Sequence, residues 1–136
     1  MKHFHFLIFL LLTFSLYAQV SFQYETRNFT QLGLTTNEQI ANYLQIELSD
    51  LLPIFLHNSM RGHVESTSPA DMYNMISSVL RNREFATFQK ISRELGVTME
   101  RFFLVFAREM GDLPEADLQM TLACIRIGVK WDIISP

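Results

Sequence analysis

From residue 36 onward, hydrophobic residues recur every three or four positions, which is the period of an amphipathic α-helix. The clearest stripe has offsets of 0, 3, 4, 7 and 8 and consists of Met72, Met75, Ile76, Val79 and Leu80. Directly before it, Ser68 can cap a helix, Pro69 fits its first position and Asp71 suits the positive end of the helix dipole. The pattern predicts a helix that begins at Pro69, after a polar loop from Arg61 to Ser68.

An earlier stripe predicts a helix that begins at Asn37 and Glu38, with Thr36 as its N-cap. Its apolar positions are Ile40, Tyr43, Leu44, Leu48, Leu51 and Leu52. We expect Pro53 to kink or end this helix, because proline has no N–H to donate and clashes with the preceding turn. A short second piece is then expected at Ile54, Phe55, Leu56 and Met60.

Two helices are predicted between residues 84 and 110. The first runs from Glu84 to Leu95 and is closed by Gly96. The second runs from Met99 to Met110, with Thr98 as its N-cap and Gly111 at its end. Its apolar arc is wide, so it needs cover on several sides. That arc consists of Phe102, Phe103, Leu104, Val105, Phe106 and Met110.

A last helix is predicted from the capping-box spacing of Asp112 and Glu115 and from a stripe at Leu118, Leu122 and Ile125. Gly128 is expected to end it, and all five glycines are expected at helix ends or in loops. No run alternates as a strand does. The predicted fold is therefore all-α, a compact bundle of five to six short helices over residues 36–136, preceded by an irregular segment at 19–35.

Residues 1–18 are typical of a secretory signal peptide, with Lys2 near the start, an apolar run from Phe4 to Leu16 and a small residue at Ala18. The run is shorter than the roughly 20 residues that span a bilayer, although an uncleaved anchor is the alternative. No second run of membrane length follows. We therefore expect an extracellular protein with no stable membrane insertion after cleavage.

Cleavage after Ala18 would leave 118 of the 136 residues, with ten basic and 14 acidic side chains and a net charge near −4. An acidic chain without a Lys/Arg block argues against nucleic acid and against an anionic membrane surface. The single cysteine, Cys124, lies among apolar neighbours, which favours a buried inert thiol over an intermolecular disulfide.

The sequence shows no catalytic motif, and no nucleophile, base and orienting group can be assembled from it, so we expect no enzyme. His57 and His63, with Glu65 nearby, lack zinc-site spacing, and we expect both to be solvated loop histidines, so we expect no metal or other cofactor. Asn28-Phe29-Thr30 fits the N-glycosylation sequon, which makes Asn28 a candidate glycosylation site.

The predicted helices are rich in Met and Phe, which can line an adaptable apolar cavity but also build an ordinary core. Between residues 84 and 114 the chain shows Glu84-Phe85, Leu95-Gly96-Val97 and Gly111-Asp112-Leu113-Pro114 in succession. With the opening Leu51-Leu52-Pro53, this segment resembles the insect-allergen-related repeat family, which includes cockroach allergens and insect midgut microvillar proteins. Asp112 interrupts the family's usual Gly-Leu-Pro, and the chain has room for one repeat.

The resemblance implies an all-helical shell around an apolar cavity that holds fatty acids or phospholipids, in a secreted setting such as the gut lumen. It implies no shared catalytic residues. Because one copy is small, the hypothesis includes a homodimer in which two chains close the cavity. Carried over by position, the cavity candidates are Phe85, Phe88, Ile91, Leu95, Phe102, Phe103, Phe106 and Met110.

The sequence therefore leaves two hypotheses about the function. The first is a secreted, non-enzymatic protein that binds an apolar ligand, a fatty acid or another lipid. The alternative is a secreted helical interaction protein without a small-molecule ligand, such as an effector, a venom component or a structural component of a gut lining or an egg coat.

Overall fold

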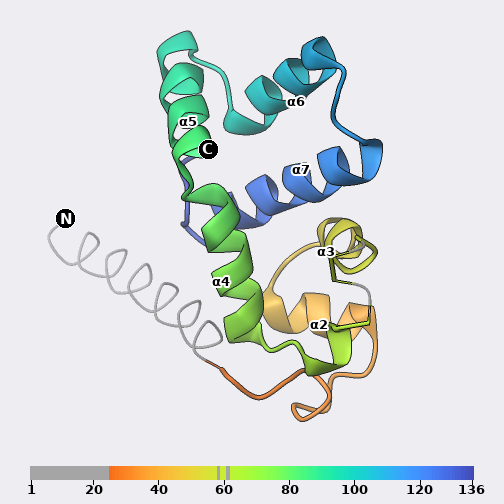
Figure 1. Ribbon diagram of the computed structural model, residues 1–136. Coiled ribbons are helices and arrows are strands. Elements are labelled where there is room, and N and C mark those ends of the chain that lie inside the picture. Colours follow the sequence, from red (N-terminus) through yellow and green to blue (C-terminus); the bar gives the residue numbers. More distant parts are fainter. Residues whose placement is uncertain (1–24, 58, 61) are drawn as a thin grey trace, which may run out of the picture.

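The computed structural model describes residues 25–57, 59–60 and 62–136, and the predicted signal peptide lies outside them. The described residues form helices and turns without a strand, which confirms the all-α prediction (Figure 1). In chain order the helices are α2 (Asn37–Leu44), α3 (Leu48–Phe55), the 3₁₀ turn η1 (Val64–Ser66), α4 (Pro69–Leu80), α5 (Arg83–Leu95), α6 (Met99–Met110) and α7 (Glu115–Lys130).

Short polar side chains start most of these helices. Thr36 and Ser68 each form a capping box, in which the cap accepts from the third helical N–H and that residue's side chain accepts from the cap. Asn82 and Thr98 accept in the same way at α5 and α6. At the other ends, Gly96 and Gly111 have the left-handed backbone expected of them. Gly96, Thr98 and Gly111 act as predicted, whereas Asn82 starts α5 at Arg83, one residue before the predicted Glu84.

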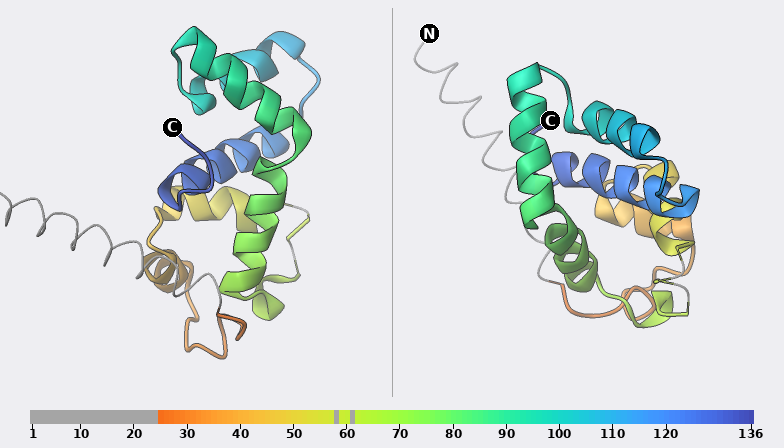
Figure 2. Two further views of the ribbon diagram at one scale, coloured as in Figure 1. Left: turned by 90° about the vertical axis from the view of Figure 1, so that its left-hand side faces the viewer. Right: turned by 45° about the horizontal axis from the view of Figure 1, so that its top comes forward.

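Helix α7 is the centre of the bundle. It packs against α3, α4 and α6, and it lies between the α5–α6 pair and the α2–α3 pair (Figures 1 and 2). Its buried residues are Leu118, Leu122, Ala123, Cys124, Ile125, Ile127 and Gly128. Because these residues point in several directions around the helix, α7 is covered on more than one side.

Two buried side chains outside the helices complete the core. Phe29 is buried in the turn before α2, where its ring lies 6.1 Å from that of Phe55. Trp131, directly after α7, is buried and donates from Nε1 to the Leu44 carbonyl at 3.2 Å. The chain before α2 and the chain after α7 are thereby held against the same core.

The predicted helix from Asn37 to Pro53 was wrong, because the chain breaks into α2 and α3. Gln45 ends α2 with a left-handed backbone of φ 60°, and the chain redirects before α3 begins at Leu48. Pro53 lies inside α3 and does not end it. The carbonyl that Pro53 leaves without an intrahelical donor belongs to Ser49, an exposed residue whose backbone can be solvated.

Two predictions about α7 were also wrong. Asp112 does not cap the helix, which begins after Pro114 and has no side-chain cap; Glu115 and Asp117 instead place negative charge in its first turn. Gly128 does not end the helix, which continues to Lys130. A Cβ at Gly128 would lie 2.2 Å from Leu80 Cδ1, so this glycine allows α4 and α7 to approach closely. In the part of the chain that the structure describes, none of the helices combines the length and the hydrophobicity of a membrane span.

Candidate functional site

Phenylalanine rings hold α5 against α6. The Phe85 ring stacks on Phe103 with centroids 5.6 Å apart, and Phe88 lies 4.8 Å from Phe106 and 5.7 Å from Phe102. Phe85 and Phe103 are buried, whereas the other three rings keep contact with solvent. The pair of helices is thus joined by an aromatic layer whose edges are open.

A groove of about 380 Å³ lies beside this layer and opens to solvent. Its apolar wall comes from α5, α6 and the connection to α7, and its polar groups are Glu84, Asp112 and Thr121. The apolar lining residues are Phe85, Phe88, Phe103, Phe106, Ala107, Met110 and Leu113. We call this hollow the α5–α6 groove.

On another side of α6, a second open hollow of about 360 Å³ is lined by Leu95, Val97, Arg101, Phe102, Val105, Phe106 and Glu109. We call the surface formed by these residues the outer face. Phe106 borders both hollows. The aromatic layer therefore separates two distinct apolar surfaces.

Exposed large hydrophobic side chains are concentrated in this part of the molecule. Among the described residues, all of them except Leu56 lie between residues 95 and 113. Leu95 is 64% exposed, Met110 58%, Val105 46% and Phe106 38%. Exposed apolar surface that is concentrated in one part of a small domain is typical of binding surfaces.

The structure divides the eight sequence-predicted cavity residues. Five of them, Phe85, Phe88, Phe103, Phe106 and Met110, line the α5–α6 groove. Leu95 and Phe102 line the outer face instead, and Ile91 is half-buried and borders neither hollow. The hollows are open grooves and not the enclosed cavity that the resemblance implied.

Sequence reasoning missed the groove residues that come from outside the helical stripes. Ala107 is small, and Leu113 belongs to a turn, so neither stands out in a hydrophobic pattern. Thr121 enters from α7, and only the packing of α7 on α6 brings it to the groove. No sequence signal points to the rim carboxylates Glu84 and Asp112, which read as ordinary helix-end charges.

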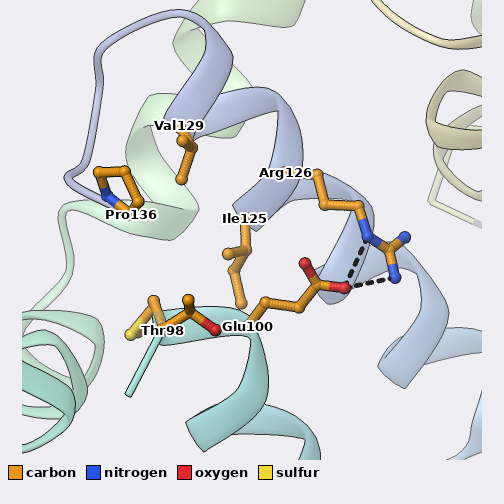
Figure 3. A pocket seen from close by; sticks show the side chains of 7 residues that line it. Thr98, Glu100, Ile125, Arg126, Val129 and Pro136 are labelled. Carbon is orange, nitrogen blue, oxygen red and sulfur yellow. Dashed lines mark hydrogen bonds and ion pairs between the residues drawn. The ribbon is translucent and has the colours of Figure 1, made fainter. Parts of the chain in front are cut away.

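A smaller hollow of about 240 Å³ lies where the start of α6 meets α7 (Figure 3). Arg126 lines this hollow and makes two hydrogen bonds. Its Nε donates to Glu100 Oε1 at 2.8 Å, and its Nη1 donates to Asp50 Oδ1 at 3.3 Å. Burial raises the pKa of the Asp50 carboxyl and outweighs the opposite effect of Arg126. Because these charges already pair with one another, we interpret this place as a joint between α3, α6 and α7.

His57 is not the solvated loop histidine that the sequence indicated. Its ring is largely buried, with Nε2 2.5 Å from Asp117 Oδ1 and Nδ1 2.8 Å from Ser59 Oγ. The Ser59 backbone N–H also donates to Nδ1 at 3.1 Å, so Nδ1 is the acceptor and Nε2–H donates to Asp117.

Serine, histidine and aspartate therefore meet here, an arrangement that the sequence did not reveal. None of the three hollows described above is lined by Ser59. The Ser59 hydroxyl also shares the Nδ1 lone pair with a backbone N–H, which weakens its activation as a nucleophile. We interpret the three residues as a tether that holds the segment after α3 on the first turn of α7.

The remaining candidate residues have local roles. Cys124 is fully buried, and burial raises the pKa of its thiol to about 12, which confirms the interpretation of a buried inert thiol. The Asn28 Oδ1 accepts from the Gln31 N–H at 2.8 Å, and Asn28 stays the predicted glycosylation site. Within the described part of the chain, no group of three or more His, Cys, Asp or Glu side chains is placed to hold a metal ion.

Comparison of the chain with protein-family models, with curated proteins and with solved structures finds no match. The resemblance to the insect-allergen-related repeat family accordingly stays a prediction from the residues quoted for it.

Proposed function

We propose that this protein is a secreted, non-enzymatic binding protein that holds an apolar ligand, the chain of a fatty acid or another lipid, in the α5–α6 groove. The observation that carries the proposal is the groove itself, with seven apolar lining residues and few polar groups. Secretion rests on the signal-peptide pattern of residues 1–18.

The size and chemistry of the groove fit such a ligand. Its volume of about 380 Å³ lies within the roughly 300–1,000 Å³ of small-molecule sites. Met110 lines the groove with a flexible thioether beside flat phenyl rings, a combination that adapts to chains of different shape. A bound alkyl chain would remove from water the apolar surface that the open groove now exposes.

The polar groups at the rim of the groove determine which lipid head groups are compatible with binding. Glu84 and Asp112 place two carboxylates there, with Thr121 as a neutral hydroxyl. A carboxylate head group near this rim would meet like charge, whereas an alcohol or an ester would not. We therefore expect a neutral lipid, such as a long-chain alcohol or a monoacylglycerol, to bind more tightly than the fatty acid anion of the same length.

The test is calorimetric titration of the mature protein with hexadecanol and with hexadecanoate. We expect saturable binding by both, tighter for the alcohol. Met110→Glu should weaken hexadecanol binding at least ~10-fold, because it buries a charge against the alkyl chain. Leu56→Glu is the matched control, since Leu56 is 61% exposed and lies outside the groove.

Absence of saturable binding to the wild-type protein would contradict the proposed function. Equal weakening by Met110→Glu and Leu56→Glu would show that the lipid does not occupy the α5–α6 groove. Absence of binding would favour the alternative, a helical interaction protein without a small-molecule ligand, whereas equal weakening would place the lipid site elsewhere on the protein.

A further inference from the structure

The outer face is an apolar surface that the proposed ligand does not use, except at the shared Phe106. Phe103 and Ala107 turn toward the interior and are buried. At 100° per residue, Val105 lies about 200° around the helix from each of them, so it points to the opposite side. Leu95, Val97 and Phe102 flank Val105 on the same hollow. No other segment in the described part of the chain covers the outer face at Val105.

The charges on this face are arranged symmetrically about Val105. Arg101 precedes it by one helical repeat of four residues, and Glu109 follows it by the same interval. Both side chains are exposed and line the outer face. Eight residues of helix separate them by about 12 Å, too far for them to pair with each other. Neither takes part in any of the ion pairs found among the described residues.

We propose that a second copy of this chain docks on the outer face, with the two α6 helices antiparallel about a two-fold axis near Val105. In that arrangement each Arg101 faces Glu109 of the second copy, and the two Val105 side chains meet at the centre. The hydrophobic residues of the outer face are buried between the copies. Helices packed 8–10 Å apart bring such side chains within ion-pairing distance.

In a two-fold arrangement the outer face would be used up within the dimer. An isologous contact uses the same patch on both copies, so it closes at a dimer. Helices α5 and α6 together carry five basic and four acidic side chains, whereas the chain as a whole has a net charge of −3. Pairing through this nearly neutral surface therefore meets less like-charge repulsion than pairing through the more acidic remainder.

The dimer goes beyond the proposed function and does not depend on it. The α5–α6 groove and the outer face have only Phe106 in common, so a dimer can form whether or not a lipid is bound. Sedimentation velocity of lipid-free mature protein over a concentration series therefore tests the dimer separately from ligand binding.

Charge reversal at the two symmetric positions provides the decisive variants. We expect Arg101→Glu to raise the dimer dissociation constant at least ~10-fold, because it places like charges opposite each other at both ends of the contact. Glu109→Arg should have the same effect. The double variant Arg101→Glu with Glu109→Arg restores both pairs with reversed sign, so it should return the dissociation constant to near that of the wild type. Lys130→Glu, an exposed reversal outside the outer face, is the matched control.

A thermal melt of each variant verifies folding, which reversal of an exposed charge should preserve. A wild-type protein that is monomeric at every concentration overturns the proposal. So does a dimer that Arg101→Glu leaves intact, or a double variant that fails to recover. A monomer that instead binds phosphatidylcholine vesicles, and loses this binding in Val105→Asp, also overturns it and assigns the outer face to a lipid surface.

Discussion

The structural role of a single residue in this protein depends on the residues that surround it in the fold. Gly128 read as a helix end, because glycine is common there, yet it lies inside α7, where a Cβ would force the Leu80 side chain to shift. His57 read as a solvated side chain, yet Asp117, sixty residues later, holds its ring. In both cases the partner is remote in sequence, so local pattern could not reveal the role.

Gly128→Ala tests the close approach of α4 and α7. Alanine gains about 1 kcal/mol over glycine in a helix interior, but overpacking a core costs about 1–3 kcal/mol. Leu80 is buried and has little room to move, so we expect a net loss of about 1 kcal/mol in the free energy of unfolding. Denaturant unfolding measures it, and a gain in stability would show that the two helices separate easily.

Cys124 provides a second residue-scale test. Its thiol is buried, and its pKa of about 12 leaves almost no thiolate at neutral or mildly alkaline pH. We expect a maleimide reagent to label the native protein far more slowly than the protein unfolded in guanidinium. Mass spectrometry of the two samples measures the difference. Equal labelling rates would mean that α7 opens readily or that Cys124 is accessible.

At the scale of the helices, the sequence predicted several boundaries correctly. Ser68, Thr98, Gly96 and Gly111 predicted the ends of α4, α5 and α6 correctly, because caps and left-handed glycines act within one turn. The break after Leu44 had no such signal, since Gln45 takes a backbone conformation that non-glycine residues seldom adopt. The caps and glycines of α4, α5 and α6 were thus predictable, whereas the break after Leu44 and both ends of α7 were not.

The joint between α3, α6 and α7 gives a prediction about pH. The pKa of Asp50 in the folded state is raised, mainly by burial, so the folded protein keeps this proton at a pH where the unfolded chain has released it. Ionisation of Asp50 therefore lowers stability as pH rises through the acidic range. We expect the stability of Asp50→Asn relative to the wild type to increase from acidic to neutral pH.

Denaturant unfolding of both proteins at a series of pH values measures this trend. Glu100 continues to pair with Arg126 in the variant, so the joint should stay formed. The opposite trend, in which Asp50→Asn loses stability relative to the wild type as pH rises, would show that the ion pair with Arg126 outweighs burial.

At the scale of the whole molecule, the sequence predicted the fold class but not which helix is central. The wide apolar arc between Phe102 and Met110 indicated that α6 would be covered on several sides. Instead α7 occupies the middle of the bundle, and α6 keeps Val105, Phe106 and Met110 exposed. Because the arrangement of helices decides which stripe is left uncovered, the candidate site could be predicted only in part.

The uncovered surface of α6 is what links the fold to binding. In a monomer, the exposed hydrophobic side chains of α5 and α6 leave apolar surface in contact with water, which is unfavourable. The proposed lipid in the α5–α6 groove and the proposed second copy on the outer face each cover one part of that surface. Both proposals assign the exposed residues a binding role.

The most direct test of the lipid-binding proposal is native mass spectrometry of the mature protein, produced through a eukaryotic secretory pathway. We expect additional mass that is released as lipid on denaturation, about one molecule per chain, and depleted in the Met110→Glu variant but retained in Leu56→Glu. A bare polypeptide mass for the wild-type protein, unchanged after incubation with hexadecanol, would contradict the lipid-binding account.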